Sequence, residues 1–265
     1  MRLDEVKGFV LDVDGTLVHR SGSGFVVEPG AVDFLEAVRS SGRPFVLFTN
    51  GSHLAPETFA ADLRSAGLPV RDDELLTPLV SVQFWLRSTD PDRSVLLFAG
   101  DESSEYLRRA GVWLVEDEPD VVFVAHSDTV DFDRLERAAR AVIGGAKLLT
   151  ASYQPAYAGA NGPILSRGAM TAAAIAKASS TRPVVVGKPS RAALAAIAHR
   201  LGARTQELAL IGDDVNMDIA LGRLGGARTI LVRSGISGRI DLDRLPERRR
   251  PDDVVEGVAE LVGRL

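Results

Sequence analysis

The chain has 265 residues, 45% of them hydrophobic and 25% charged, so it can bury a sizeable core and is long enough for two domains. A net charge of −5 with acidic and basic residues interspersed argues against nucleic-acid binding, which uses a basic patch. The sequence lacks cysteine, which excludes disulfides, thiolate metal sites and thiol catalysis.

The basic cluster Arg248-Arg249-Arg250 is typical of a solvated loop. The longest apolar runs stay well short of the roughly 20 residues that a membrane helix needs. The charged first residues lack the pattern of a signal peptide. We therefore expect a soluble, cytoplasmic protein with no membrane partner.

The first predicted element is an apolar run at residues 8–11 that stops at Asp12, Asp14 and Gly15. Such a run before a turn signal predicts a strand buried on both faces of a parallel sheet. The carboxylates would project from its C-terminal end, the edge where open α/β sheets bind ligands. Two carboxylates on one side of a strand repel unless a cation or a shared proton relieves them. An ordinary Asp-x-Asp-Gly turn is the alternative.

The following residues predict a βαβ unit. A Gly/Ser-rich loop at 21–24 precedes a helix from about Pro29 to Gly42, and a second buried strand covers 44–48. A further helix is expected over 56–66. The second strand therefore runs parallel to the first and ends at the same edge.

Polar groups follow this second strand at Thr49, Asn50 and Gly51. A hydroxyl, an amide and backbone N–H groups just before a helix predict the binding of a phosphate oxygen. Ser52 would belong to the same anion site or cap the helix instead. His53 is a minor candidate for substrate contact.

From about Leu79 to Ser180 the pattern restarts, which predicts a second small α/β unit inserted into the first. Strands are expected at 94–99, 121–125 and 147–151, with helices at 102–110 and 132–143.

A long loop is expected from Ser152 to Gly168, and loops of this length are usually functional. We therefore expect it to determine substrate specificity, with a disordered surface loop as the alternative. Its polar candidates are Tyr153, Gln154, Tyr157, Asn161 and Ser166.

A buried strand at 183–186 is expected to return the chain to the first unit, and it leads into Gly187, Lys188 and Pro189. Because a residue before proline avoids the helical region, Lys188 would be presented from extended backbone. A lysine near two carboxylates and a phosphate would neutralise both. A helix over 191–201 follows.

A last buried strand at 207–211 runs into Asp213, Asp214 and Asp218. An oxygen-rich cluster without His or Cys suits a hard cation, and Mg²⁺ best fits a site that also takes phosphate. A capped helix with a negative first turn would explain Asn216 and Asp218. It would not explain Asp213 and Asp214 together.

These motifs stand in the order and placement of the four motifs of the haloacid dehalogenase superfamily, which the chain resembles nearly end to end. The motifs are Asp12-Val13-Asp14-Gly15-Thr16, Thr49-Asn50, Gly187-Lys188-Pro189 and Gly212-Asp213-Asp214-x-x-x-Asp218. The insertion resembles the α/β cap of subclass IIA, which includes nitrophenyl-phosphate, phosphoglycolate and nucleotide-monophosphate phosphatases. The resemblance implies an α/β fold with a Rossmann-like parallel-sheet core at 1–80 and 181–265 and a C2-type cap at 81–180.

The resemblance also implies a Mg²⁺-dependent phosphatase acting on small phosphomonoesters. Asp12 would be the nucleophile that forms an aspartyl-phosphate, and Asp14 would be the general acid and base. Lys188 would balance the charge of Asp12 and the phosphate. Thr49 would hydrogen-bond the transferring phosphoryl group, with Asn50 beside it.

The metal ligands implied by the resemblance are Asp12, the backbone carbonyl of Asp14, and Asp213. Asp218 would be an outer-shell support, and a metal role for Asp214 stays open. Relatives in this subclass often dimerise through the cap, so a homodimer is expected by analogy.

The chain departs from the family where substrates are chosen. Many relatives carry Thr-Asn-Pro-Asp after the cap strand, whereas here Thr150 is followed by Ala151-Ser152-Tyr153-Gln154-Pro155. Because that carboxylate is missing, the substrate of a relative cannot be assigned to this chain. Tyr153 would stack on a substrate ring or pack against the core.

Three other functions compete with this one. A phosphomutase or other phosphotransferase would share Asp12, but the relatives of that kind have helical caps. A non-catalytic phospholigand-binding protein is disfavoured because every motif residue is intact. A two-component receiver domain also uses Asp, Thr and Lys with Mg²⁺, but it needs no insertion of about a hundred residues.

Overall fold

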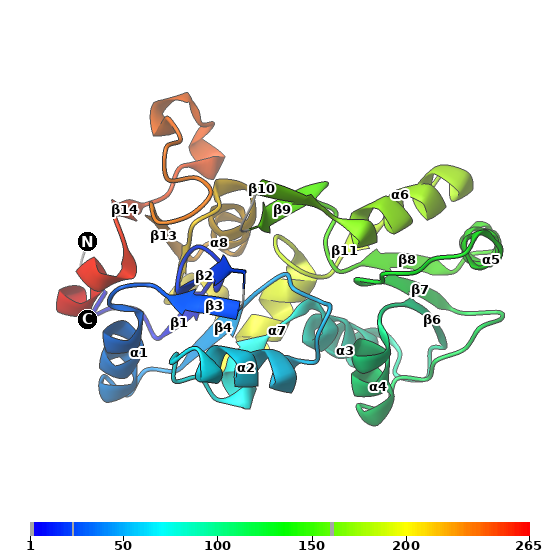
Figure 1. Cartoon of the computed structure of the whole chain (residues 1–265), viewed down its shortest axis with the longest axis horizontal. Coiled ribbons are helices and arrows are strands. Elements are labelled where there is room, and N and C mark those ends of the chain that lie inside the picture. The colour runs from blue at the N-terminus through cyan, green and yellow to red at the C-terminus, as the bar shows by residue number, and fades with distance from the viewer. Residues whose placement is uncertain (1–2, 23, 160–161) are drawn as a thin grey trace. The chain divides into compact units, whose positions relative to one another are not determined.

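The computed structural model describes residues 3–22, 24–159 and 162–265. Contacts divide the chain into two compact units, each built from parallel strands and helices (Figure 1). The first unit comprises Met1–Thr49, Glu57–Leu76 and Lys188–Leu265, and the second comprises Asn50–Pro56 and Thr77–Gly187. The expected α/β fold with an inserted second α/β unit is confirmed.

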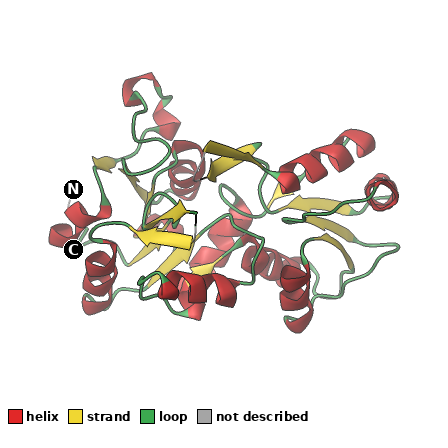
Figure 2. Ribbon diagram, in the orientation of Figure 1, coloured by secondary structure: helices red, strands yellow, loops and turns green. Residues whose placement is uncertain are grey.

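A parallel sheet forms the centre of the first unit (Figure 2). Within the described ranges its strands stand in the order β14 (Asp253–Val255), β13 (Arg228–Val232), β12 (Leu208–Gly212), β1 (Gly8–Leu11), β4 (Phe45–Phe48) and β5 (Leu75–Leu76). The strands β1, β4 and β12 are buried along their whole length. Helices cover such a sheet on both faces, as the near-continuous apolar runs predict.

The helices of the first unit lie between these strands in the sequence, as the connections of a parallel sheet require. They are α1 (Ala31–Ser40), α2 (Pro56–Ser65), α7 (Arg191–Leu201) and α8 (Ala220–Gly225). In α1 the apolar side chains recur at helical spacing and are fully buried, so one face packs on the sheet. Phe34 meets Phe9 of β1 edge to face, with ring centroids 6.2 Å apart. Burying a side chain of this size stabilises a fold by about 1.5–3 kcal/mol.

A second parallel sheet forms the centre of the second unit. Its described strands stand in the order β11 (Val184–Val185), β8 (Lys147–Thr150), β7 (Val121–Val124) and β6 (Val95–Phe98). Its helices are α3 (Pro78–Thr89), α4 (Asp101–Arg109), α5 (Phe132–Ile143) and α6 (Arg167–Ser179). Small and branched residues of α5 and α6, among them Ala138 and Ile175, pack against Phe98 and Val122.

Two hairpins replace predicted loops. β2 (Val18–Ser21) pairs with β3 (Gly24–Val27) around the Gly/Ser-rich segment. β9 (Ala156–Gly159) pairs with β10 (Gly162–Leu165) inside the segment predicted as a loop from Ser152 to Gly168, and Asn161 lies outside the described residues. Both hairpins are short and rich in glycine, so they lack the sustained apolar alternation by which strands are recognised in a sequence.

Three further elements differ from expectation. The helices α3 and α6 were not predicted, although Thr77 and Ser166 cap them by accepting backbone N–H groups. The strand β11 was expected to be buried in the first unit. It is instead an edge strand paired with β8 of the second sheet, and Val184 is half exposed. Ser52 does not cap α2, because that helix begins only at Pro56.

Short 3-10 turns complete the first unit, most of them in its C-terminal part. They lie at Asp72–Glu74, Thr205–Glu207, Leu242–Arg244, Glu247–Arg249 and Val258–Arg264. The basic run at 248–250 is exposed, as expected for a solvated loop. Among residues 3–22, 24–159 and 162–265, no helix has the length and apolar character needed to cross a membrane.

Candidate active site

Asp12 lies directly after β1, and its backbone N–H donates to the carbonyl of Ile211 in the neighbouring strand β12 (2.9 Å). Its carboxylate is nearly buried. Thr16 Oγ1 donates to Asp12 Oδ2 (3.2 Å), and Lys188 Nζ donates to Asp12 Oδ1. Both oxygens of Asp12 are therefore oriented by the turn that follows β1 and by a residue distant in sequence.

Lys188 is almost completely buried and binds two carboxylates. Its Nζ also donates to Asp218 Oδ1 at 2.7 Å. Burial by itself would lower the pKa of Lys188, but the charges of Asp12 and Asp218 outweigh it and raise the pKa above the ordinary value. The two carboxylates therefore favour the cationic form of the lysine.

Asp213 follows β12, and its carboxylate is held among backbone groups. Ile236 N–H donates to Asp213 Oδ2 at 2.7 Å. A Cβ on Gly15, which has a φ of 84°, or on Gly235 would overlap the Asp213 carboxylate. The turn after β1 therefore needs glycine both for its left-handed backbone and for the room that Asp213 occupies.

Asp218 lies in a π-helical turn, Val215–Ile219, that precedes α8. Its Oδ2 accepts the N–H of Asp214 (3.1 Å), so both of its oxygens have partners. Asp214 in turn caps the turn by accepting the N–H of Asn216 at 2.7 Å. The capping residue is thus Asp214, whereas the capping alternative explained only Asn216 and Asp218, and Asp218 instead holds Lys188.

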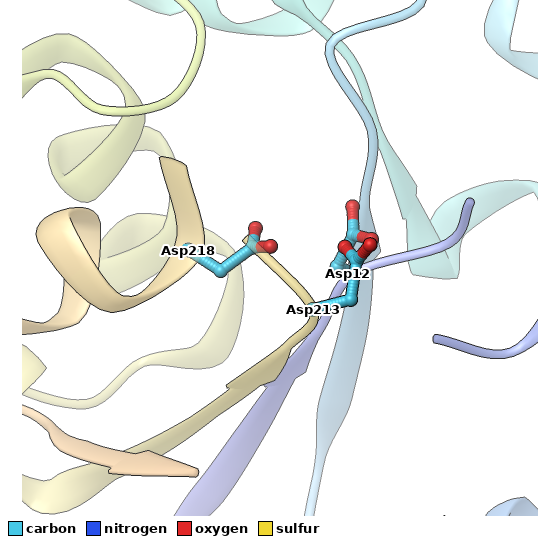
Figure 3. A group of neighbouring side chains, drawn as sticks. All are labelled: Asp12, Asp213 and Asp218. Carbon is cyan, nitrogen blue, oxygen red and sulfur yellow. The ribbon is translucent and has the colours of Figure 1, made fainter. Parts of the chain in front are cut away.

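Asp12, Asp213 and Asp218 form one buried cluster. Each offers a carboxylate oxygen, and these oxygens lie within 4.8 Å of one another. Figure 3 shows Asp12 and Asp213 at the ends of their strands, with Asp218 directed toward them from the helical turn. These carboxylates carry more negative charge than Lys188 can balance. Such a buried group of carboxylate oxygens suits a hard divalent cation.

The pKa values of the cluster express the same excess of negative charge. Burial, together with the charges of Asp12 and Asp218, raises the pKa of Asp213 to about 9. Burial and the charge of Asp12 raise the pKa of Asp218 to about 7, although Lys188 opposes the shift. Burial likewise raises the pKa of Asp214, although the hydrogen bond from the Asn216 N–H opposes the shift.

Asp14 is about one-third exposed and pairs with Arg20, a residue that the sequence analysis missed. Arg20 Nε lies 2.8 Å from Asp14 Oδ1. The Arg20 guanidinium also lies over the Phe25 ring, 5.1 Å from its centroid, within the β2–β3 hairpin. Burial raises the pKa of Asp14, Arg20 opposes this, and the charge of Asp12 adds to it. Gly22 between the strands and Gly24 at the start of β3 were the sequence signal for this hairpin.

The remaining predicted residues divide between the two units. Thr49 is buried after β4, the strand beside β1, and its N–H donates to Leu76 O (3.2 Å). Asn50 and Gly51 follow it but belong to the second unit, as do Tyr153 and Gln154 after β8. Tyr153 is 44% exposed, which rules out packing in the core. The structure thus gathers Asp12, Asp213, Asp218 and Lys188 in one cluster of the first unit.

Comparison with known proteins gives a consistent family. Residues 9–113 match the sequence model described as haloacid dehalogenase-like hydrolase, and residues 185–261 match one described as HAD-hydrolase-like. The chain is 31% identical over 256 residues to the ribonucleotide monophosphatase NagD of Escherichia coli strain K12, a match that covers 97% of this chain and 98% of that protein.

Solved structures agree. A p-nitrophenyl phosphatase from Archaeoglobus fulgidus has a TM-score of 0.87 at 28% identity, over 98% of this chain and 100% of the other. A 4-nitrophenylphosphatase from Thermotoga maritima has a TM-score of 0.89 at 26% identity, over 98% of both chains.

Proposed function

The chain belongs to the haloacid dehalogenase-like hydrolases of subclass IIA and is a phosphoric monoester hydrolase, and from this premise we propose that it hydrolyses small phosphomonoesters through an aspartyl-phosphate on Asp12 with the aid of Mg²⁺. The observation that carries the proposal is the buried cluster in which Lys188 binds Asp12 and Asp218, next to Asp213. These residues come from separate stretches of the chain, and each belongs to a predicted motif.

Mg²⁺ would be held by Asp12, Asp213 and the backbone carbonyl of Asp14. When bound, it would supply positive charge that offsets the carboxylates and the phosphoryl oxygens. Asp218 would support the site by holding Lys188 and the Asp214 N–H.

In the first half-reaction Asp12 would attack phosphorus while the ester P–O bond breaks and Asp14 gives its proton to the leaving alcohol. In the second, Asp14 would take a proton from water, which attacks phosphorus and releases phosphate from Asp12. A carboxylate nucleophile divides the hydrolysis into two easier displacements. Burial of Asp14 favours its acidic form and Arg20 its ionised form, which supports a role in both steps.

Thr49, Asn50 and Gly51 would hold the phosphoryl oxygens, because a hydroxyl, an amide and backbone N–H groups there suit an anion. Lys188 would neutralise charge that spreads in the transition state. The second unit would act as the cap that selects the leaving group, with Tyr153 and Gln154 as candidate contacts.

The proposal is tested by measuring phosphate release from a panel of small phosphomonoesters with and without Mg²⁺, beside the variant Asp12→Asn. Mg²⁺-dependent release by the natural chain and none by the variant is the expected result. Release that persists in Asp12→Asn would refute the covalent route, and isomerised phosphate in place of free phosphate would indicate a mutase.

A further inference from the structure

The segment Asn50–Pro56 directly follows the proposed phosphate-binding residue Thr49, yet it packs in the second unit. The chain on both sides of it, up to Thr49 and over Glu57–Leu76, belongs to the first unit. Asn50 and Gly51, which the proposed function assigns to phosphate binding, therefore lie in a segment that packs with the second unit.

The second half of this segment is bound by the first turn of α4. Glu102 Oε1 accepts the backbone N–H of Ala55 at 3.0 Å. The next residue, Ser103, donates its buried hydroxyl to the carbonyl of Ser52 at 3.1 Å. Ala55 is buried, so its N–H would otherwise lose its hydrogen bond to water without replacement.

The middle and the start of the segment have contacts of their own. The His53 ring meets the His126 ring edge to face, with centroids 6.0 Å apart. Asn50 Oδ1 lies against Gly187, where an added Cβ would come within 2.5 Å of that oxygen. The segment thus has neighbours in the second unit at Asn50, at its middle and at Ala55, and Gly51 lies between the first two.

From these contacts we propose that Glu102 is a positioning residue for phosphate binding, an inference that rests on the proposed function. It acts by accepting the Ala55 N–H and thereby holding the segment 50–56. A loop that is ordered before the ligand arrives binds more tightly, because the cost of ordering it is not taken from the binding free energy. The substrate's phosphate group is the ligand whose affinity Glu102 therefore sets.

The test uses Glu102→Ala, Glu102→Gln and Glu105→Ala in the full chain. Gln keeps an oxygen that can accept the Ala55 N–H. Glu105 is the matched control, because it lies three residues further along α4, is exposed and pairs only loosely with Arg108 (3.8 Å). Inorganic phosphate is the probe, measured as a competitive inhibitor of 4-nitrophenyl phosphate hydrolysis, and thermal unfolding reports the folded fraction.

Loss of a charge-assisted hydrogen bond predicts that Glu102→Ala weakens phosphate inhibition and raises KM by about tenfold, with a smaller change in kcat. Glu102→Gln is expected to stay within about threefold of the natural chain, and Glu105→Ala within about twofold. Hydrogen exchange of peptides covering 50–56 should be faster in Glu102→Ala alone. This pattern separates positioning from general destabilisation, which would lower the active fraction without changing KM.

An active natural chain whose phosphate inhibition is unchanged in Glu102→Ala would overturn this inference and leave the proposed function standing. The inference also fails if Glu102→Gln is as impaired as Glu102→Ala, because the accepting oxygen would then not matter. A natural chain that neither hydrolyses phosphomonoesters nor binds phosphate would overturn the proposed function, and the role of Glu102 with it.

Discussion

The sheets of the two units are built in the same way but differ in the residues that follow their strands. β1 in the first unit and β6 in the second are both four-residue strands that are buried along their whole length within a parallel sheet. After β1 come Asp12 and Asp14, whereas after β6 come Ala99 and Gly100. The strand β12 also ends in carboxylates, while the described residues that follow β7 and β8 begin with Ala125 and Ala151.

The difference shows that the parallel sheet positions side chains but does not determine what they do. In the first unit the strand ends gather carboxylates around Lys188, and in the second they lead into helices, one of which holds the segment 50–56. Charge at the strand ends is therefore expected to be essential in the first unit and dispensable in the second.

The largest expected effect is that of Asp12→Asn, which removes the nucleophile and should lower kcat for 4-nitrophenyl phosphate by at least roughly 10⁴-fold. The matched control is Asp101→Asn, an exposed aspartate that follows β6 at the start of α4. It should stay within about twofold of the natural chain. Equal losses in the two variants would erase the distinction between the sheets.

Asp14→Asn removes the proton donor, and a general acid contributes roughly 10²–10⁴-fold to such a step. The loss should be large for alkyl phosphates, whose alcohol leaves poorly, and smaller for 4-nitrophenyl phosphate, whose phenolate needs less help. Steady-state rates on a series of phosphate esters measure how the loss depends on the leaving group. Equal losses across the series would refute the role of Asp14 as an acid.

Lys188→Met leaves Asp12 and Asp218 buried without their cation. Breaking a buried ion pair by removing one partner costs about 3–5 kcal/mol, so the free energy of unfolding should fall and kcat should drop by about 10²-fold. Chemical denaturation and initial rates measure the two effects. Lys147→Met is the control, because that lysine begins β8 of the second sheet and is exposed. A stable, active Lys188→Met would contradict the charge balance described above.

The sequence predicted the strand ends well, because each carries two signals at once. A short apolar run followed by Gly and Asp marks both a buried strand and its polar end, as at Asp12 and Asp213. The helix over 132–143 was also predicted with its observed bounds, since its apolar face is regular.

Other features depend on contacts that no local pattern contains. The strand β11 is as apolar as a core strand, and only its pairing with β8 assigns it to the second sheet. The pair of Arg20 with Asp14 needs the β2–β3 hairpin, and the bond of Glu102 to Ala55 joins residues 47 positions apart. Sequence spacing predicts such neighbours only after the topology is known.

The last expected effect is a pH dependence of stability confined to the first unit. The folded chain keeps protons on Asp218 and Asp213 up to pKa values of about 7 and 9, whereas in the unfolded chain these carboxyls have the ordinary value of 3.8. Their contribution to stability is complete below the ordinary pKa and is lost as the pH rises through 7 and then 9. In EDTA the first unit should therefore become less stable over that range.

Mg²⁺ should oppose this loss, because it binds the ionised carboxylates of the folded state. At a concentration one hundred times its dissociation constant it should raise the free energy of unfolding by about 2.7 kcal/mol. Far-UV circular dichroism follows both units, while tryptophan fluorescence follows the second, since both tryptophans, Trp85 and Trp113, lie there. The Mg²⁺-dependent shift at alkaline pH should appear in the dichroism and be absent from the fluorescence. A shift of equal size in both signals would mean that the two units unfold together, and the contrast between their sheets would then concern chemistry alone and not stability.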